Sequence, residues 1–208
     1  MESLLRWGIQ NSQPEGAREP SASAPPAPRK DLDPAILDHI LGRPDWELMK
    51  EALEKALDET LPEDARVSAL DDMEMLVEHI DNASDLEKLK MWEPLRTLLV
   101  APSSTDGIRL QALWVIGTAV QNNPAAQKAC LSHDPLPAVL PLLSPSVRSA
   151  ALRSKAVYAL SGLLKHNASA VDQLEQTGGW DVLRDALQDS DISVRRKTAF
   201  LLNTLLIP

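Results

Sequence analysis

The fold is decided by three strings that recur along the chain: Arg109-Leu-Gln-Ala-Leu-Trp114, Arg153-Ser-Lys-Ala-Val-Tyr158 and Arg195-Arg-Lys-Thr-Ala-Phe200. Their arginines are 44 and 42 residues apart, and an aromatic residue follows each arginine at the fifth position. The chain has one Tyr and one Phe, and both fall in this register. A fourth string, Arg66-Val-Ser-Ala69, begins 43 residues before Arg109. The sequence therefore repeats about every 43 residues.

A second set of positions recurs with the same spacing along the chain. Trp92, Leu136 and Trp180 open apolar helical segments 44 residues apart, and Asn123 and Asn167 follow the aromatic-bearing helices at the same spacing. A period of this size without the alternating pattern of strands is typical of armadillo or HEAT solenoids. We predict an all-α, armadillo-type helical solenoid of about four repeats of 42–44 residues. Because solenoids usually serve as binding surfaces, this pattern favours a binding protein over an enzyme.

Four regions are expected along the chain. Residues 1–10 form a short apolar head, and residues 11–30 carry five prolines and form a disordered linker. Residues 31–61 form an N-terminal helical cap, with helices at 33–42 and from Asp45 to about Asp58, and residues 62–208 hold the repeats. We expect the last repeat to be incomplete or uncapped, because the sequence stops just after the helix that carries Phe200.

Composition limits the possible partners and compartments. A net charge of −9 disfavours nucleic acid and anionic membrane surfaces as partners. A single cysteine, Cys130, excludes an internal disulfide and fits a reducing compartment. The chain has neither the apolar core of a signal peptide nor an apolar run of about 18 residues. We expect a cytoplasmic protein that acts as a monomer and does not bind a membrane.

No catalytic or metal-binding motif is present in the sequence. Cys130 and His133 lie one helical turn apart but lack the further ligands that zinc requires. The acids between Asp71 and Asp85 are interpreted as a solvated helix face. Asn82 and Asn167 each begin a glycosylation triplet, which we interpret as a helix cap in the repeat turn. We expect no metal and no cofactor.

The aromatic register leaves two readings open. In peptide-binding armadillo proteins, a Trp and an Asn four residues later line a groove. Here Thr118, Gly162 and Thr204 occupy the later position, so the asparagine that would clamp a peptide backbone is missing. Trp114 and Tyr158 could equally face a groove or pack between repeats. For Phe200, packing between repeats is the favoured expectation.

Several longer strings resemble one family of armadillo proteins. They are Met1-x-x-Leu4-Leu5-x-Trp7-x-Ile9-x-Asn11-Ser12, Glu74-Met-Leu-Val-Glu-His-Ile-Asp-Asn-Ala83, Leu89-Lys-Met-Trp-Glu-Pro-Leu95, Ile116-Gly-Thr-Ala-Val-Gln-Asn-Asn123 and Lys155-Ala-Val-Tyr-Ala-Leu-Ser161. In this order they resemble the Fes-type, or HspBP-like, armadillo nucleotide-exchange factors of heat-shock protein 70, in their fungal form. The resemblance runs from residue 1 to about residue 204.

The resemblance implies a co-chaperone that binds the nucleotide-binding domain of heat-shock protein 70 and speeds ADP release. It implies a contact surface made of Asn82, Ala83, Trp92, Glu93, Gln121, Asn122, Asn123, Arg196 and Lys197, to which the register adds Trp114, Thr118 and Tyr158. For Trp92, core packing is the favoured alternative. The head residues Leu4, Leu5, Trp7 and Ile9 are expected to make a second, weaker contact. The alternative function is an armadillo adaptor that binds a peptide or protein without exchange activity.

Overall fold

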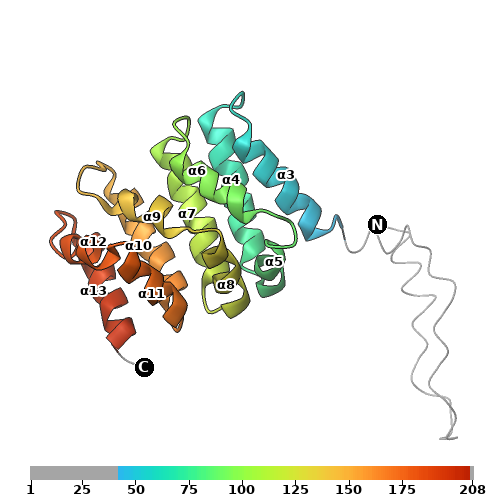
Figure 1. Cartoon of the computed structure of the whole chain (residues 1–208). Helices are drawn as coiled ribbons and strands as arrows, with labels where there is room; N and C mark the ends of the chain where they lie inside the picture. The colour runs from blue at the N-terminus through green and yellow to red at the C-terminus, as the bar shows by residue number, and fades with distance from the viewer. Residues whose placement is uncertain (1–41, 207–208) are drawn as a thin grey trace, which may run out of the picture. The chain divides into compact units, whose positions relative to one another are not determined.

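The computed structural model describes residues 42–206, and this part of the chain is entirely helical, with no strand. The helices lie side by side in a continuous stack (Figure 1). Their bounds are α3 (Asp45–Leu57), α4 (Glu63–Val77), α5 (Ile80–Asp85), α6 (Trp92–Val100), α7 (Asp106–Val120), α8 (Pro124–Ser132), α9 (Leu136–Val139), η1 (Leu140–Leu143), α10 (Ala150–Leu164), α11 (Ala168–Gln176), α12 (Gly179–Ala186) and α13 (Ile192–Leu206). The all-α solenoid predicted from the repeat is therefore confirmed. The helix expected over 33–42 lies outside the described residues.

Equivalent helices of successive repeats form rows. The long helices α4, α7, α10 and α13 pack one against the next, and each carries one of the repeated arginines. The shorter helices α3, α6, α9 with η1, and α12 pack behind them. We call the exposed side of the row of α4, α7, α10 and α13 the groove face.

The repeated arginines explain why the sequence keeps its register. Each one donates hydrogen bonds to backbone carbonyl groups in the segment that precedes its own helix. The pairs are Arg66 with Ala56, Arg109 with Leu99 and Ala101, Arg153 with Val147, and Arg195 with Asp189. Carbonyls at a helix end or in a loop lack an intrahelical partner, so these bonds satisfy them and fix the angle between successive helices.

The repeated asparagines behave in two ways. The side chains of Asn123 and Asn167 accept hydrogen bonds from the amides of Ala126 and Ala170, at 3.1 and 3.2 Å, and so cap α8 and α11. The cap predicted for Asn167 is therefore confirmed. The same prediction for Asn82 is wrong. This residue lies inside α5, which starts at Ile80, because the first repeat carries two extra residues before it.

The row of long helices is closest between α7 and α10. A Cβ atom on Gly162 would lie 3.0 Å from the backbone oxygen of Gly117. A Cβ atom on Gly117 would lie 2.5 Å from the ring of Tyr158. Glycine at these two positions therefore lets the helices approach closely and leaves room for the tyrosine ring.

Candidate partner-binding face

The aromatic residues of the register all reach the groove face. Trp114 and Tyr158 are half-buried, while Phe200 is 70% exposed. The expectation that Phe200 packs between repeats is wrong. In the described part of the chain no helix follows α13, so nothing there covers the ring as α10 covers part of α7.

A chain of polar contacts holds Tyr158 in place across three helices. The hydroxyl of Thr118 donates to Glu74 at 2.6 Å and lies 3.1 Å from the hydroxyl oxygen of Tyr158. Glu74 comes from α4, Thr118 from α7 and Tyr158 from α10. Thr118 thus uses the position of the missing asparagine to join neighbouring repeats, so Tyr158 both supports the scaffold and lines its surface.

Lys155 is part of the same assembly. Its ammonium nitrogen lies 3.3 Å from the centre of the Trp114 ring and 5.1 Å from that of Tyr158, within the range of cation–π attraction. Burial lowers the pKa of this ammonium group, and the nearby charge of Lys197 lowers the pKa further. The lysine is therefore held on the protein's own aromatic rings rather than presented freely to a partner.

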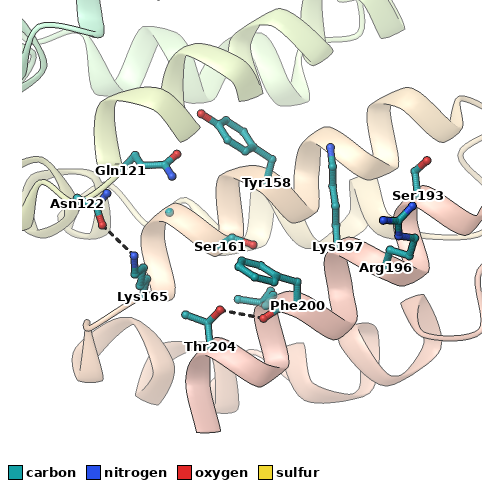
Figure 2. Close-up of a pocket in the computed structure, with 12 residues that line it drawn as sticks. Gln121, Asn122, Tyr158, Ser161, Lys165, Ser193, Arg196, Lys197, Phe200 and Thr204 are labelled. Atoms are coloured by element: carbon teal, nitrogen blue, oxygen red, sulfur yellow. Dashed lines mark hydrogen bonds between the residues drawn. The ribbon is translucent and has the colours of Figure 1, made fainter. Parts of the chain in front are cut away.

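The groove face is hollowed between α7, α10 and α13. The cavity has a volume of about 610 Å³. Figure 2 shows Gln121 and Asn122 at one end, Tyr158, Ser161 and Lys165 along α10, and Ser193, Arg196, Lys197, Phe200 and Thr204 along α13. Of the predicted contact residues, the structure brings Gln121, Asn122, Tyr158, Arg196 and Lys197 together in this cavity.

Three predicted contact residues are in the core instead. Ala83 and Trp92 are each 2% exposed, and Asn123 is 3% exposed. The contact-surface assignment is therefore wrong for Ala83 and Asn123, and the core packing favoured for Trp92 is confirmed. Ala83 packs within the hydrophobic core, as Trp92 does. Asn123 is enclosed because it also donates to the carbonyl of Ile80 and the hydroxyl of Ser84, which ties α8 to α5.

Asn82 and Glu93 lie away from the cavity. Asn82 is half-buried, and its amide donates to the carbonyl of Leu76 at 2.9 Å and to the carboxylate of Asp45 at 2.8 Å. Glu93 is exposed on α6, in the row behind the groove face, and receives two hydrogen bonds from Arg96. The predicted head contacts, Leu4, Leu5, Trp7 and Ile9, lie outside the described residues.

Sequence reasoning missed three residues of the groove face: Lys155, Lys165 and the exposed ring of Phe200. One signal was available, because Gln111, Lys155 and Lys197 all stand two residues after a repeated arginine. Gln111 also bridges repeats, through a 3.0 Å bond to Asp71. No comparable pattern in the sequence marks Lys165.

Residues 42–206 contain no cluster of three or more potential metal ligands. Burial raises the pKa of the Cys130 thiol to about 12, so the thiol stays protonated near neutral pH. None of the described helices is long and apolar enough to cross a membrane. What the face offers is a firmly supported surface for another molecule.

Comparison with known protein families identifies the family of the chain. The family model described as nucleotide exchange factor Fes1 matches residues 1–86, and the model of the SIL1/FES1/HPBP1 C-terminal domain matches residues 82–207. The chain belongs to the Fes1 family. The two matches meet within α5, so the family covers both the head of the chain and its solenoid.

Curated relatives carry the name Hsp70 nucleotide exchange factor FES1. The relative from Mycosarcoma maydis is 45% identical over 99% of this chain and 54% of its own length. The relative from Cryptococcus neoformans is 43% identical over 89% of this chain and 51% of its own length. The one from Schizosaccharomyces pombe is 36% identical over 100% of this chain and 70% of its own length. The chain thus spans about half the length of the first two.

Solved structures confirm the architecture. A designed armadillo repeat protein in complex with the peptide (KR)4 superposes with a TM-score of 0.65 at 17% identity, covering 74% of this chain and 62% of its own. An engineered protein superposes with a TM-score of 0.67 at 15% identity, covering 85% of this chain and 76% of its own. At such identities the likeness concerns the fold alone.

Proposed function

We propose that this chain is a nucleotide-exchange co-chaperone that binds the nucleotide-binding domain of heat-shock protein 70 and accelerates release of ADP. The observation that carries this proposal is the groove face: a hollowed, partly aromatic surface on a rigid solenoid, in a chain of the Fes1 family. The relatives named Hsp70 nucleotide exchange factor support it.

Exchange activity requires a difference in affinity. The factor must bind the ADP-free chaperone more tightly than the ADP-bound chaperone, and ADP must then weaken factor binding by the same ratio. A flexible surface would adapt to both states and favour neither. The contacts from Glu74 through Thr118 to Tyr158, and the close approach of α7 and α10, make the middle of this face stiff.

The chaperone contact is proposed to lie on the groove face. Of the contact residues expected from the sequence, it keeps Trp114, Thr118, Gln121, Asn122, Tyr158, Arg196 and Lys197. Phe200 and Lys165 are added because they line the same cavity. The contact proposed for residues 4–9 remains a prediction. A tethered head would raise its own effective concentration at the chaperone once the solenoid is bound. We also propose that the factor acts as a monomer in the cytoplasm.

Release of labelled ADP from the chaperone's nucleotide-binding domain tests the function directly. Stopped-flow fluorescence after mixing with excess ATP should show faster release when micromolar factor is present. Gln121→Trp, which adds bulk beside the cavity, should reduce this acceleration. Gln188→Trp, which changes another exposed glutamine in the turn before α13, should leave it intact.

Two results would contradict the proposal. Absence of binding between the chain and the chaperone domain would reject it completely. Binding without faster ADP release would favour an adaptor instead.

A further inference from the structure

One buried polar link joins α10 to the segment that leads into α13. Arg153 of α10 donates from Nε and Nη2 to the two carboxylate oxygens of Asp189, at 2.6 and 2.7 Å. Both side chains are buried, with 5% and 2% exposed. Within residues 42–206, no other side-chain hydrogen bond joins α10 to residues 187–206. The pair therefore supplies the directional contact between these two segments.

Asp189 passes this contact on to the first turn of α13. Its carboxylate also accepts a bond from the amide of Asp191 at 2.7 Å, and its backbone carbonyl accepts one from Arg195 at 2.6 Å. The carboxylate of Asp191 in turn accepts from the amides of Ser193 and Val194, at 2.8 and 3.2 Å. Asp191 thus caps α13. The start of the helix is tied through the buried pair to α10.

This link is peculiar to the last joint, where a joint is the place at which two successive long helices pack. Counted from the repeated arginine, Asp189 stands where the preceding repeat has Val147. The joint between α7 and α10 relies instead on close backbone contact at Gly162, whose place in α13 is held by Thr204. The last joint therefore carries a buried acid that the preceding repeat does without.

Orientation explains a buried ion pair better than stability does. Removing two charges from water is unfavourable, and an apolar pair of similar volume often stabilises a protein as well or better. Val147 shows that an apolar residue is accommodated at this place in the preceding repeat. What the pair adds is direction, because the planar guanidinium group of Arg153 meets both oxygens of Asp189 in one geometry.

The angle between α10 and α13 sets the shape of the cavity on the groove face. Tyr158 and Lys165 line it from α10, while Arg196, Lys197 and Phe200 line it from α13 (Figure 2). The separation of these two walls depends on how α13 is held against α10. The buried pair lines no part of the cavity, so its influence on a bound partner is exerted through the helices.

We propose that Arg153 and Asp189 are positioning residues for the chaperone contact. They hold α13 at the angle to α10 that the nucleotide-binding domain recognises, without touching that domain themselves. This inference rests on the proposed function and adds a positioning role to it. A factor that must favour one state of its partner needs its contact groups held in a defined geometry, which apolar packing alone specifies less strictly.

A concentration series of ADP release provides the first test. Asp189→Asn preserves the size of the side chain but removes its charge, and should raise the half-saturating factor concentration by about threefold to thirtyfold. Asp185→Asn removes the same charge from an exposed residue of α12 and should leave that concentration unchanged. Leu53→Ala, a core truncation in α3, lowers stability far from the joint and should also leave it unchanged. Circular dichroism checks that each variant is folded.

An apolar replacement of the pair separates orientation from stability. Arg153→Met/Asp189→Leu leaves no charge buried, so urea denaturation should show it to be more stable than Asp189→Ala. Its half-saturating concentration should nevertheless stay raised to about the level of Asp189→Asn, because the directional bonds are gone. If the pair served stability alone, exchange would recover together with stability.

Spin labels on the two helices measure the orientation without the chaperone. Ala151→Cys and Asn203→Cys place labels at exposed positions of α10 and α13, outside the cavity, while Cys130 is buried. Double electron–electron resonance should give a narrow distance distribution in the otherwise wild-type chain. The distribution should broaden or shift when Asp189→Asn or Arg153→Met/Asp189→Leu is added.

The outcomes separate this inference from the proposed function. Wild-type distance distributions in both pair variants, or wild-type exchange by folded Arg153→Met/Asp189→Leu, would overturn the positioning role and leave the exchange function standing. If that double variant does not fold, equal half-saturating concentrations for Asp189→Asn and Leu53→Ala would overturn it instead. Failure of the wild-type chain to accelerate ADP release would reject the function, while the spin labels would still decide whether the pair orients α13.

Discussion

The two ends of the described solenoid use charge in different ways. At the first end, a hollow between α3 and α4 is lined by both signs of charge, and Glu51 there receives hydrogen bonds from Arg43 at 2.7 Å and Lys55 at 2.8 Å. At the other end, Arg196 and Lys197 have no partner within residues 42–206. The same repeat architecture thus carries paired surface charges at one end and cations without a partner at the other. The end that carries Arg196 and Lys197 is therefore the better candidate for contact with a partner.

Removing the buried ion pair beneath the basic end should have the largest effect on stability. Arg153 and Asp189 have side chains only 5% and 2% exposed and are joined by two hydrogen bonds of 2.6 and 2.7 Å. Asp189→Ala leaves the arginine buried without a counter-charge, so we expect a loss of about 3–5 kcal/mol in the free energy of unfolding. Urea denaturation measures it. Asp185→Ala, at an exposed acid of α12, should cost far less, and equal losses would contradict this account.

Acid should weaken the same pair. The hydrogen bond from Arg153 lowers the pKa of Asp189 below its unfolded value. The pair's stabilisation is therefore fully present above the unfolded pKa of about 3.9 and is lost as the pH falls through the lower folded pKa. The difference in unfolding free energy between wild type and Asp189→Asn should shrink from about pH 6 to about pH 2.5. A difference that stays constant over this range would contradict the assignment.

Removing the hydrogen bond from Thr118 to Glu74, which joins α7 to α4, should have an intermediate effect on stability. Thr118→Val keeps the shape of the side chain but removes the hydroxyl that donates to Glu74, which is 8% exposed. We expect a loss of about 1–3 kcal/mol, because a nearly buried carboxylate is left without this donor. Thr204→Val is the control, since its hydroxyl bonds only to a carbonyl of its own helix. Thermal unfolding of both variants would decide, and equal midpoints would contradict the role of Thr118.

Removing the charge of Glu51, at the end where the charges are paired, should have the smallest effect on stability and affinity. The hydrogen bond from Lys55, followed by that from Arg43, lowers the pKa of Glu51 to about 2, but all three side chains are well exposed. Exposed pairs contribute little to stability, so Glu51→Gln should leave the thermal midpoint and chaperone affinity unchanged within error. A clear loss of affinity would show that the first end also contacts the partner, and the contrast between the two ends would then fail.

The sequence predicts the scaffold better than the surface because the two depend on different information. Arg109, Arg153 and Arg195 recur because every repeat must satisfy similar backbone groups, and recurrence is visible in one sequence. Whether a given position faces solvent depends on the angle between neighbouring helices, which the spacing does not contain. Ala83, which the family resemblance assigns to the contact surface, is buried for this reason, whereas the core packing favoured for Trp92 is confirmed.

The position of Phe200 could not be obtained from the spacing for a related reason. Its register is the same as that of Trp114 and Tyr158, yet its exposure is set by what packs beside α13. The unpaired state of Arg196 likewise follows from the absence of acids on neighbouring helices around the cavity. Such properties arise between repeats and appear only when the repeats are placed in space.

The two glycines at the centre of the row have a mechanical consequence. Where backbone lies against backbone, as at Gly117 and Gly162, two helices cannot tilt without colliding or separating. Bending of the solenoid is then expected mainly between α10 and α13, because the bonds from Thr118 to Glu74 and from Gln111 to Asp71 also tie α7 to α4. A molecule bound in the cavity would therefore contact both helices of this joint.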